Sequence, residues 1–80
     1  MTPAQLRAAR ALLDWSRNDL QRASGISPET IKNIECGKFN PTGNTVEKII
    51  RCFADHGVEF MGHKQIQGVM LMTSEKETEQ

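Results

Sequence analysis

Apolar residues recur at intervals of three and four positions between residues 3 and 56, a spacing typical of amphipathic helices. The spacing predicts four helices, over residues 3–13, 17–24, 28–36 and 45–56. The fourth has the most regular apolar stripe, formed by Val46, Ile49, Ile50 and Phe53. After Gly57 the apolar residues gather in two short runs, residues 58–61 and 69–72, which predict the strands of a β-hairpin. We therefore expect a mostly α fold of four short helices with a C-terminal hairpin.

Each predicted helix begins after a residue that can accept a hydrogen bond from the free backbone amides of the first turn. These residues are Thr2, Ser16, Ser27 and, for the fourth helix, either Thr42 or Asn44. The first two are followed three positions later by Gln5 and Asp19, which predicts a reciprocal capping box at each site. Gly25 can adopt the left-handed conformation that ends the second helix. Residues 16–37 are therefore predicted to be two short helices joined by a tight glycine turn.

The same pattern divides the chain into three parts. Residues 1–57 form a helical domain, residues 58–72 form the hairpin, and residues 73–80 form an acidic tail that is expected to be disordered. The whole chain has ten basic and ten acidic residues and a formal net charge of zero, which is unusual for a protein that binds nucleic acid. The tail contains one lysine and three glutamates, however, so residues 1–72 have a net charge of +2. DNA binding would require these charges on one face and two copies per site.

Several classes of function are disfavoured. The chain has no apolar run of about 18 residues and no secretory signal, so we expect a cytoplasmic protein with no membrane partner and with reduced thiols. The spacing of the residues that could bind zinc matches no zinc finger; these residues are Cys36, Cys52, His56 and His63. No catalytic arrangement is visible either. We expect no metal, no cofactor and no enzymatic activity, with Trp15 in the core and His56 stabilising the negative end of the fourth helix.

One set of residues resembles the helix-turn-helix of the lambda-repressor-like family, the Cro and repressor class of bacterial and phage regulators: Leu20, Gly25, Ile26, Ser27, Thr30, Ile31, Ile34, Glu35 and Gly37. The resemblance covers about residues 3–56, and the hairpin is similar to one that small bacterial regulators of this class add. Two positions depart from the family pattern: Gln21 stands where the family usually has alanine, and Arg17 where it commonly has a phosphate-binding glutamine. The resemblance implies that Glu35 is structural, and we expect it to form an ion pair within the domain.

The resemblance also implies that the helix over residues 28–36 lies in the major groove of double-stranded DNA. Its outward residues would face the bases, with Asn33 suited to adenine, Lys32 to guanine, Glu29 to cytosine and Thr30 to a thymine methyl group. The complete predicted DNA-binding set is Arg17, Ser27, Pro28, Glu29, Thr30, Lys32, Asn33, Lys38 and Asn40. Within it, Arg17, Lys38, Asn40 and the amides that open the second and third helices would bind phosphates. Lys32 and Asn33 could instead be no more than the solvated face of a surface helix.

Both alternating faces of the second strand are apolar, and so small a chain can cover only one of them. We expect the other face or the open edge to meet a second copy and form a two-fold dimer. The predicted interface consists of Val58, Phe60, Val69, Met70, Leu71 and Met72. The leading interpretation is thus a homodimeric, sequence-specific regulator, acting as a repressor by steric exclusion. The alternative is an antitoxin-like module whose hairpin and acidic tail bind another protein.

Overall fold

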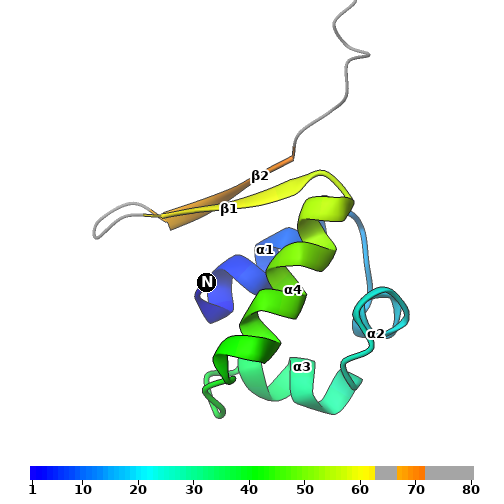
Figure 1. Cartoon of the computed structure of the whole chain (residues 1–80), viewed down its shortest axis with the longest axis vertical. Coiled ribbons are helices and arrows are strands. Elements are labelled where there is room, and N and C mark those ends of the chain that lie inside the picture. Colours follow the sequence, from blue (N-terminus) through cyan, green and yellow to red (C-terminus); the bar gives the residue numbers. More distant parts are fainter. Residues whose placement is uncertain (63–66, 72–80) are drawn as a thin grey trace, which may run out of the picture.

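A computed structural model describes residues 1–62 and 67–71 of the chain (Figure 1). The helices are α1 (Pro3–Leu12), α2 (Arg17–Ser24), α3 (Pro28–Glu35) and α4 (Gly43–Asp55), followed by the strands β1 (Val58–Gly62) and β2 (Gln67–Leu71). The predicted four helices and C-terminal hairpin are confirmed. The predicted acidic tail, Met72 and His63 lie outside the described residues.

Polar caps begin the helices where the sequence indicates. The hydroxyls of Thr2 and Ser16 accept hydrogen bonds from the amides three residues on, and the side chains of Gln5 and Asp19 bond back to the cap amides. Both predicted capping boxes are therefore confirmed. Thr42, rather than Asn44, caps α4, so this helix begins two residues earlier than the predicted start at residue 45.

Gly25 ends α2 in the left-handed conformation, with φ of 80°. A side chain at this φ would strain the backbone, which explains why glycine makes the turn between α2 and α3. The chain then re-enters a helix after Ser27, whose side chain accepts a hydrogen bond from the amide of Thr30. The turn between the two helices is therefore only a few residues long, as predicted.

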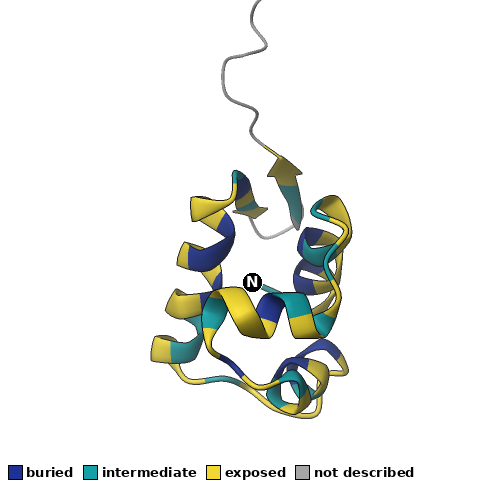
Figure 2. Ribbon diagram, turned by 90° about the vertical axis from the view of Figure 1, so that its right-hand side faces the viewer, coloured by how far each residue is buried: buried dark blue, intermediate teal, exposed yellow. Residues whose placement is uncertain are grey.

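The core lies where the four helices and β1 face one another (Figure 2). Its buried apolar residues are Leu6, Ala9, Leu20, Ile26, Ile31, Ile34, Ile49, Cys52, Phe53 and Val58. Trp15 packs against this core with its ring centroid 5.6 Å from that of Phe53, which confirms its predicted structural role. The prediction that Ile50 belongs to the buried stripe of α4 is wrong, because Ile50 is 37% exposed. The stripe is narrower than the spacing suggested.

The hairpin lies across one end of the helices, over α1 and α4, whereas α3 lies at the opposite end (Figure 1). Its strands are antiparallel, with Val58 opposite Leu71, Phe60 opposite Val69 and Met61 opposite Gly68. Phe60 packs its ring against Phe53 of α4, at a centroid distance of 5.7 Å. Aromatic contacts thus join the hairpin to the helical core. None of the helices in the described part of the chain is long and apolar enough to cross a membrane.

Candidate nucleic-acid interface

Helix α3 has one buried side and one side open to solvent. Ile31, Ile34 and Glu35 are buried and fix the helix against its neighbours. The residues predicted to face bases all lie outside the core: Glu29 and Lys32 are exposed, and Pro28, Thr30 and Asn33 are half-buried. Since the buried residues recur three and four positions apart, the polar ones between them are presented together along the outer side. The five residues of α3 that are predicted to face bases are thus all at least partly accessible.

The cap of α3 also organises the first of these residues. The hydroxyl of Ser27 accepts from the amide of Thr30 at 3.2 Å and donates to the hydroxyl oxygen of Thr30 at 2.9 Å. The exposed Glu29 stands in the first turn, where a negative charge interacts favourably with the partial positive charge of the helix end. The amino end of α3 is therefore ordered by its own side chains.

The capping box of α2 engages two of the amides at the amino end of this helix. The carboxylate of Asp19 accepts from the amide of Ser16 at 2.8 Å, and Arg22 forms an ion pair with the same carboxylate. The hydrogen bonds from the backbone and side chain of Ser16, with a smaller contribution from Arg22, lower the pKa of Asp19 below its usual value of 3.8. Because the amides of Ser16 and Asp19 are engaged, they are not available to a phosphate, which restricts the predicted role of this helix end.

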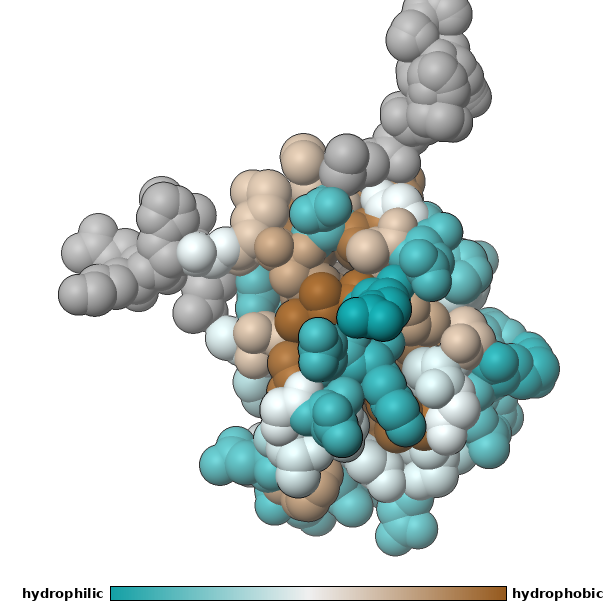
Figure 3. Space-filling view, in the orientation of Figure 1, coloured by the Kyte–Doolittle hydropathy of each residue, from teal (hydrophilic) through white to brown (hydrophobic). Residues whose placement is uncertain are grey.

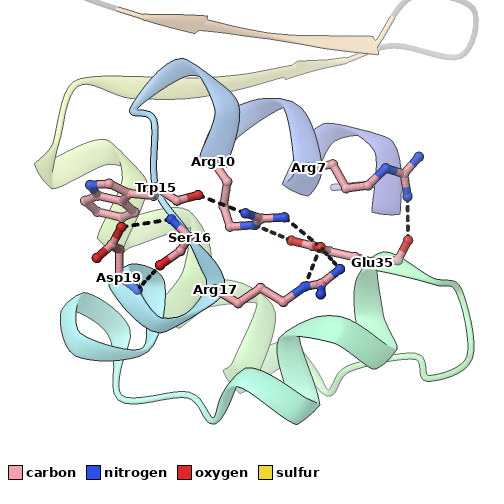
Figure 4. Close-up of polar contacts among 7 residues, drawn as sticks. All are labelled: Arg7, Arg10, Trp15, Ser16, Arg17, Asp19 and Glu35. Carbon is pink, nitrogen blue, oxygen red and sulfur yellow. Dashed lines mark hydrogen bonds and ion pairs between the residues drawn. The ribbon is translucent and has the colours of Figure 1, made fainter.

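A buried carboxylate joins the first three helices (Figure 4). The side chain of Glu35 is 1% exposed and accepts two hydrogen bonds from the guanidinium of Arg10, at 2.6 and 3.0 Å. Arg17 binds the same carboxylate at 3.1 Å, and Arg7 donates to the backbone carbonyl of Glu35. Arg10 additionally donates to the carbonyl of Trp15 at 2.8 Å. The expected ion pairing of Glu35 within the domain is confirmed, and it holds the end of α3 against α1 and the start of α2.

The sequence reasoning missed the role of Arg10. Its position did contain a signal, because Leu6, Arg10 and Leu13 follow the helical spacing of four and three residues. A cation at a position that faces the core requires a buried partner. Arg17, by contrast, was predicted as a phosphate ligand. Its side chain is 39% exposed while it pairs with Glu35, so its charge is partly neutralised within the chain.

The loop between α3 and α4 contributes further polar groups. Lys38 and Asn40 are both exposed, as their predicted phosphate contacts require. Phe39 between them is 44% exposed and was not singled out from the sequence. Figure 3 shows that the surface around α3 is mostly hydrophilic or neutral, whereas apolar surface gathers where α4 meets the hairpin.

Two capped helices joined by a glycine turn, the second of them presenting a polar outer side, define a helix-turn-helix DNA-binding domain. A family model described as "Helix-turn-helix" matches residues 6–54, which is more than half of the chain. The chain therefore belongs to this family, the Cro and repressor type of helix-turn-helix found in DNA-binding transcriptional regulators. A search of curated proteins finds no match to the chain.

The hairpin residues predicted to form a dimer interface lie in different environments. Val58 is fully buried in the core of its own chain, so its side chain is not accessible to a partner. Phe60 and Val69 are half-buried against the same core. Met70 and Leu71 are 45% and 43% exposed, and Met61, which the sequence reasoning did not include, is 44% exposed. Accessible apolar surface on the described hairpin is therefore concentrated on Met61, Met70 and Leu71.

The two cysteines are free thiols, Cys36 exposed and Cys52 buried. Burial, reinforced by the nearby charge of Asp55, raises the pKa of the Cys52 thiol. His56 caps α4, and its ring Nδ1 donates to the carbonyl of Cys52 at 2.8 Å, which fits the predicted role at this helix end. Among residues 1–62 and 67–71, no three potential metal ligands come together.

Proposed function

We propose that the chain is a sequence-specific transcriptional repressor that binds DNA as a homodimer, with α3 of each copy in the major groove. The observation that supports this most directly is the division of α3 into a buried and an exposed side. Ile31, Ile34 and Glu35 anchor the helix, and the polar residues between them are accessible. A rigidly held helix with a polar outer side is what readout of base edges in the groove requires.

The base contacts follow from the chemistry of the side chains on the outer side of α3. Asn33 can form two hydrogen bonds with adenine, Lys32 can donate to guanine, and the carboxylate of Glu29 can accept from cytosine. The methyl group of Thr30 suits a thymine methyl. Glu29 also repels phosphates, so it would favour sites where cytosine offers it a donor. Together these contacts would give the protein its sequence preference.

Phosphate contacts would come from Arg17, Lys38, Asn40 and the amino end of α3 at Ser27. Arg17 pairs with Glu35 at the start of α2 while its side chain stays 39% exposed, so it would still be accessible to a phosphate of the DNA backbone. The same pairing lowers the positive charge that one copy offers to DNA. A second copy on the same site would therefore contribute much of the affinity.

The second copy would join through the hairpin. Met61, Met70 and Leu71 expose apolar surface there, at the opposite end of the molecule from α3 (Figure 1). Pairing of the open strand edges of two hairpins would extend the sheet across the two copies, bring these exposed residues close to those of the partner, and allow both α3 helices to lie on the same side for two half-sites about one helical turn apart. Repression would follow from steric exclusion of the polymerase.

The same exposed surface favours one other candidate function, a module that binds a different protein in the manner of an antitoxin. The two functions make different predictions for purified components. A homodimer forms without any partner, whereas the module remains monomeric until its target is added.

DNA binding is tested by titrating the full chain with random-sequence DNA at two salt concentrations, followed by selection of bound sequences. We expect affinity to fall steeply with salt. Replacing Lys32 or Asn33 with alanine should weaken binding to the selected site by about 5- to 150-fold while the melting temperature hardly changes. Lys48→Ala, which removes an exposed charge from α4, is the matched control. Affinity that ignores salt would contradict DNA binding.

Dimer formation is tested by sedimentation of the wild type and of Met70→Lys. Met70 is 45% exposed, so the substitution should leave the fold intact and convert a dimer into a monomer. Leu12→Lys, at a position that is 41% exposed on α1, is the control for adding a lysine at an exposed apolar position. If Met70→Lys sediments like the wild-type dimer, this face of the hairpin is not the interface.

A further inference from the structure

A single buried side chain of α1 bonds to both strands of the hairpin. Gln5 is 6% exposed, and its Nε2 donates to the carbonyl of Met61 at 2.6 Å and to that of Gly68 at 2.8 Å. Met61 and Gly68 stand directly opposite each other in the ladder. The Oε1 of the same amide accepts from the backbone amide of Thr2 at 2.8 Å. Every polar atom of the Gln5 side chain is therefore engaged.

The close approach of α1 to the hairpin makes these bonds possible. The hollow between α1 and β2 is lined by Thr2, Ala4, Gln5, Ala8 and Gly68, most of which have small side chains. No other side chain among residues 1–62 and 67–71 forms a hydrogen bond with the backbone of the hairpin. Val58, Phe60 and Val69 join the hairpin to the core through apolar and aromatic contacts, which direct orientation less strongly than hydrogen bonds do.

The same helix also holds α3. Arg10 binds the buried carboxylate of Glu35 through two hydrogen bonds, and Arg7 binds the backbone carbonyl of that residue. Gln5 attaches the hairpin near the start of α1, and Arg10 attaches α3 about 1.4 turns further on. One rigid helix thus connects the element proposed to join two copies with the element proposed to read DNA.

We propose that Gln5 is a positioning residue that sets the angle between the hairpin and α3, and thereby the half-site spacing that the dimer accepts. This inference rests on the proposed function. Because one nitrogen bonds carbonyls on both strands, tilting the hairpin over α1 breaks at least one of the two bonds. In a two-fold dimer built on the hairpin, the same tilt moves both α3 helices relative to each other.

Gln5→Glu separates this role from the capping of α1. Glutamate is also used at the third position of a capping box, so the variant keeps the acceptor for the amide of Thr2. It loses both donors to the hairpin and places a carboxylate against two carbonyl oxygens. Gln5→Met is an uncharged second variant of similar size. Thr2→Val is the matched control, because it weakens the other half of the capping box and leaves the donors of Gln5 in place.

The first measurement is amide hydrogen exchange in the full chain. For both Gln5 variants we expect the amides of the hairpin to exchange about 5- to 150-fold faster, while those of α2 and α3 keep their protection. Thr2→Val should leave exchange in the hairpin unchanged. Unchanged exchange in the Gln5 variants would mean that Gln5 does not hold the hairpin, and would overturn the proposal.

The second measurement is binding to DNA that contains one or two copies of the half-site selected by the wild type, with the distance between copies varied one base pair at a time. We expect the wild type to prefer one spacing, and the Gln5 variants to lose that preference while binding a single half-site within about twofold of wild type. A preserved preference despite faster exchange in the hairpin would overturn the role in spacing. A wild type that binds no DNA specifically would overturn the proposed function and the spacing role together, and exchange would still decide whether Gln5 holds the hairpin.

Discussion

Replacing Glu35 with glutamine removes the negative charge that two arginines share. The substitution keeps the size of the side chain and one acceptor oxygen, so it perturbs charge more than packing. Arg10 would lose one of the two acceptor oxygens that it binds, and both Arg10 and Arg17 would lose the negative charge with which they pair. The stability of the helix-turn-helix should fall, because the buried end of α3 is held by this carboxylate.

The magnitude follows from the burial of the partners. Removing one partner of a buried ion pair costs about 3–5 kcal/mol. The side chain of Glu35 is 1% exposed, but Arg10 and Arg17 are 18% and 39% exposed and can gain contacts with water. We therefore expect a loss near the lower end, about 3 kcal/mol. A domain of 80 residues has a total stability of about 4–12 kcal/mol, so the loss is a large part of it.

The assay is urea unfolding followed by far-ultraviolet circular dichroism, which gives the free energy of unfolding of each variant. Glu47→Gln is the matched control. Glu47 pairs with Arg51 at 3.7 Å on the surface of α4, where both side chains are about 70% exposed, and its loss should change stability by no more than about 0.5 kcal/mol. If Glu35→Gln costs no more than Glu47→Gln, the carboxylate of Glu35 does not hold α3 in place.

Three further predictions concern the backbone, the thiols and pH. Gly25→Ala should cost about 1–2 kcal/mol because Gly25 has φ of 80°, whereas Gly43→Ala, with no positive φ and open space around it, should be neutral or stabilise by up to about 1 kcal/mol. Thermal unfolding compares the two, and equal effects would contradict this account. An alkylating reagent should modify Cys36 rapidly and Cys52 only after unfolding, because Cys52 is buried and the pKa of its thiol is raised. Mass spectrometry after brief labelling measures the modification of each thiol, and equal labelling of the two would contradict the burial of Cys52. The pKa of Asp19 is lowered on folding, so its stabilising effect should be complete above its usual pKa of 3.8 and decline as the pH falls through the lowered value. The difference in urea midpoint between the wild type and Asp19→Asn should therefore shrink in acid, and a constant difference from pH 7 to about pH 2 would be inconsistent with the lowered pKa.

Local signals in the sequence predicted the helices well because the interactions that start and end a helix are short in sequence. Thr2 and Ser16 bond to residues three positions away, and Gly25 acts through its own φ. The start of α4 was placed two residues late because Thr42 and Asn44 can both cap a helix, and local chemistry does not choose between them. Helical spacing also suggested that Ile50 is buried, but Ile50 is 37% exposed. The spacing of apolar residues shows which side of a helix faces the core, and it does not show how wide the buried stripe on that side is.

For contacts between distant parts of the chain, the sequence indicated the kind of interaction and did not identify the partner residue. The sequence indicated that Glu35 forms an ion pair, but Arg10 lies 25 positions away, and nothing local connects the two. Gln5 was identified only as part of a capping box, because its bonds to the hairpin depend on how α1 packs against β2. The exposed residues of α3 could be placed once the buried positions of its stripe were known. Their contacts with DNA remain predictions.

The hydrogen bond between Gln5 and Gly68 joins residues that are 63 positions apart in the chain, so it can form only after Gly68 has been synthesised. The residues of α1 and α3 are synthesised before the hairpin, so the contacts between these two helices can form before those between α1 and β2. Until Gly68 emerges, the amide of Gln5 bonds to water. A nascent chain can therefore fold its helix-turn-helix before it has the element through which two copies are proposed to join, so assembly into pairs would follow synthesis of the hairpin.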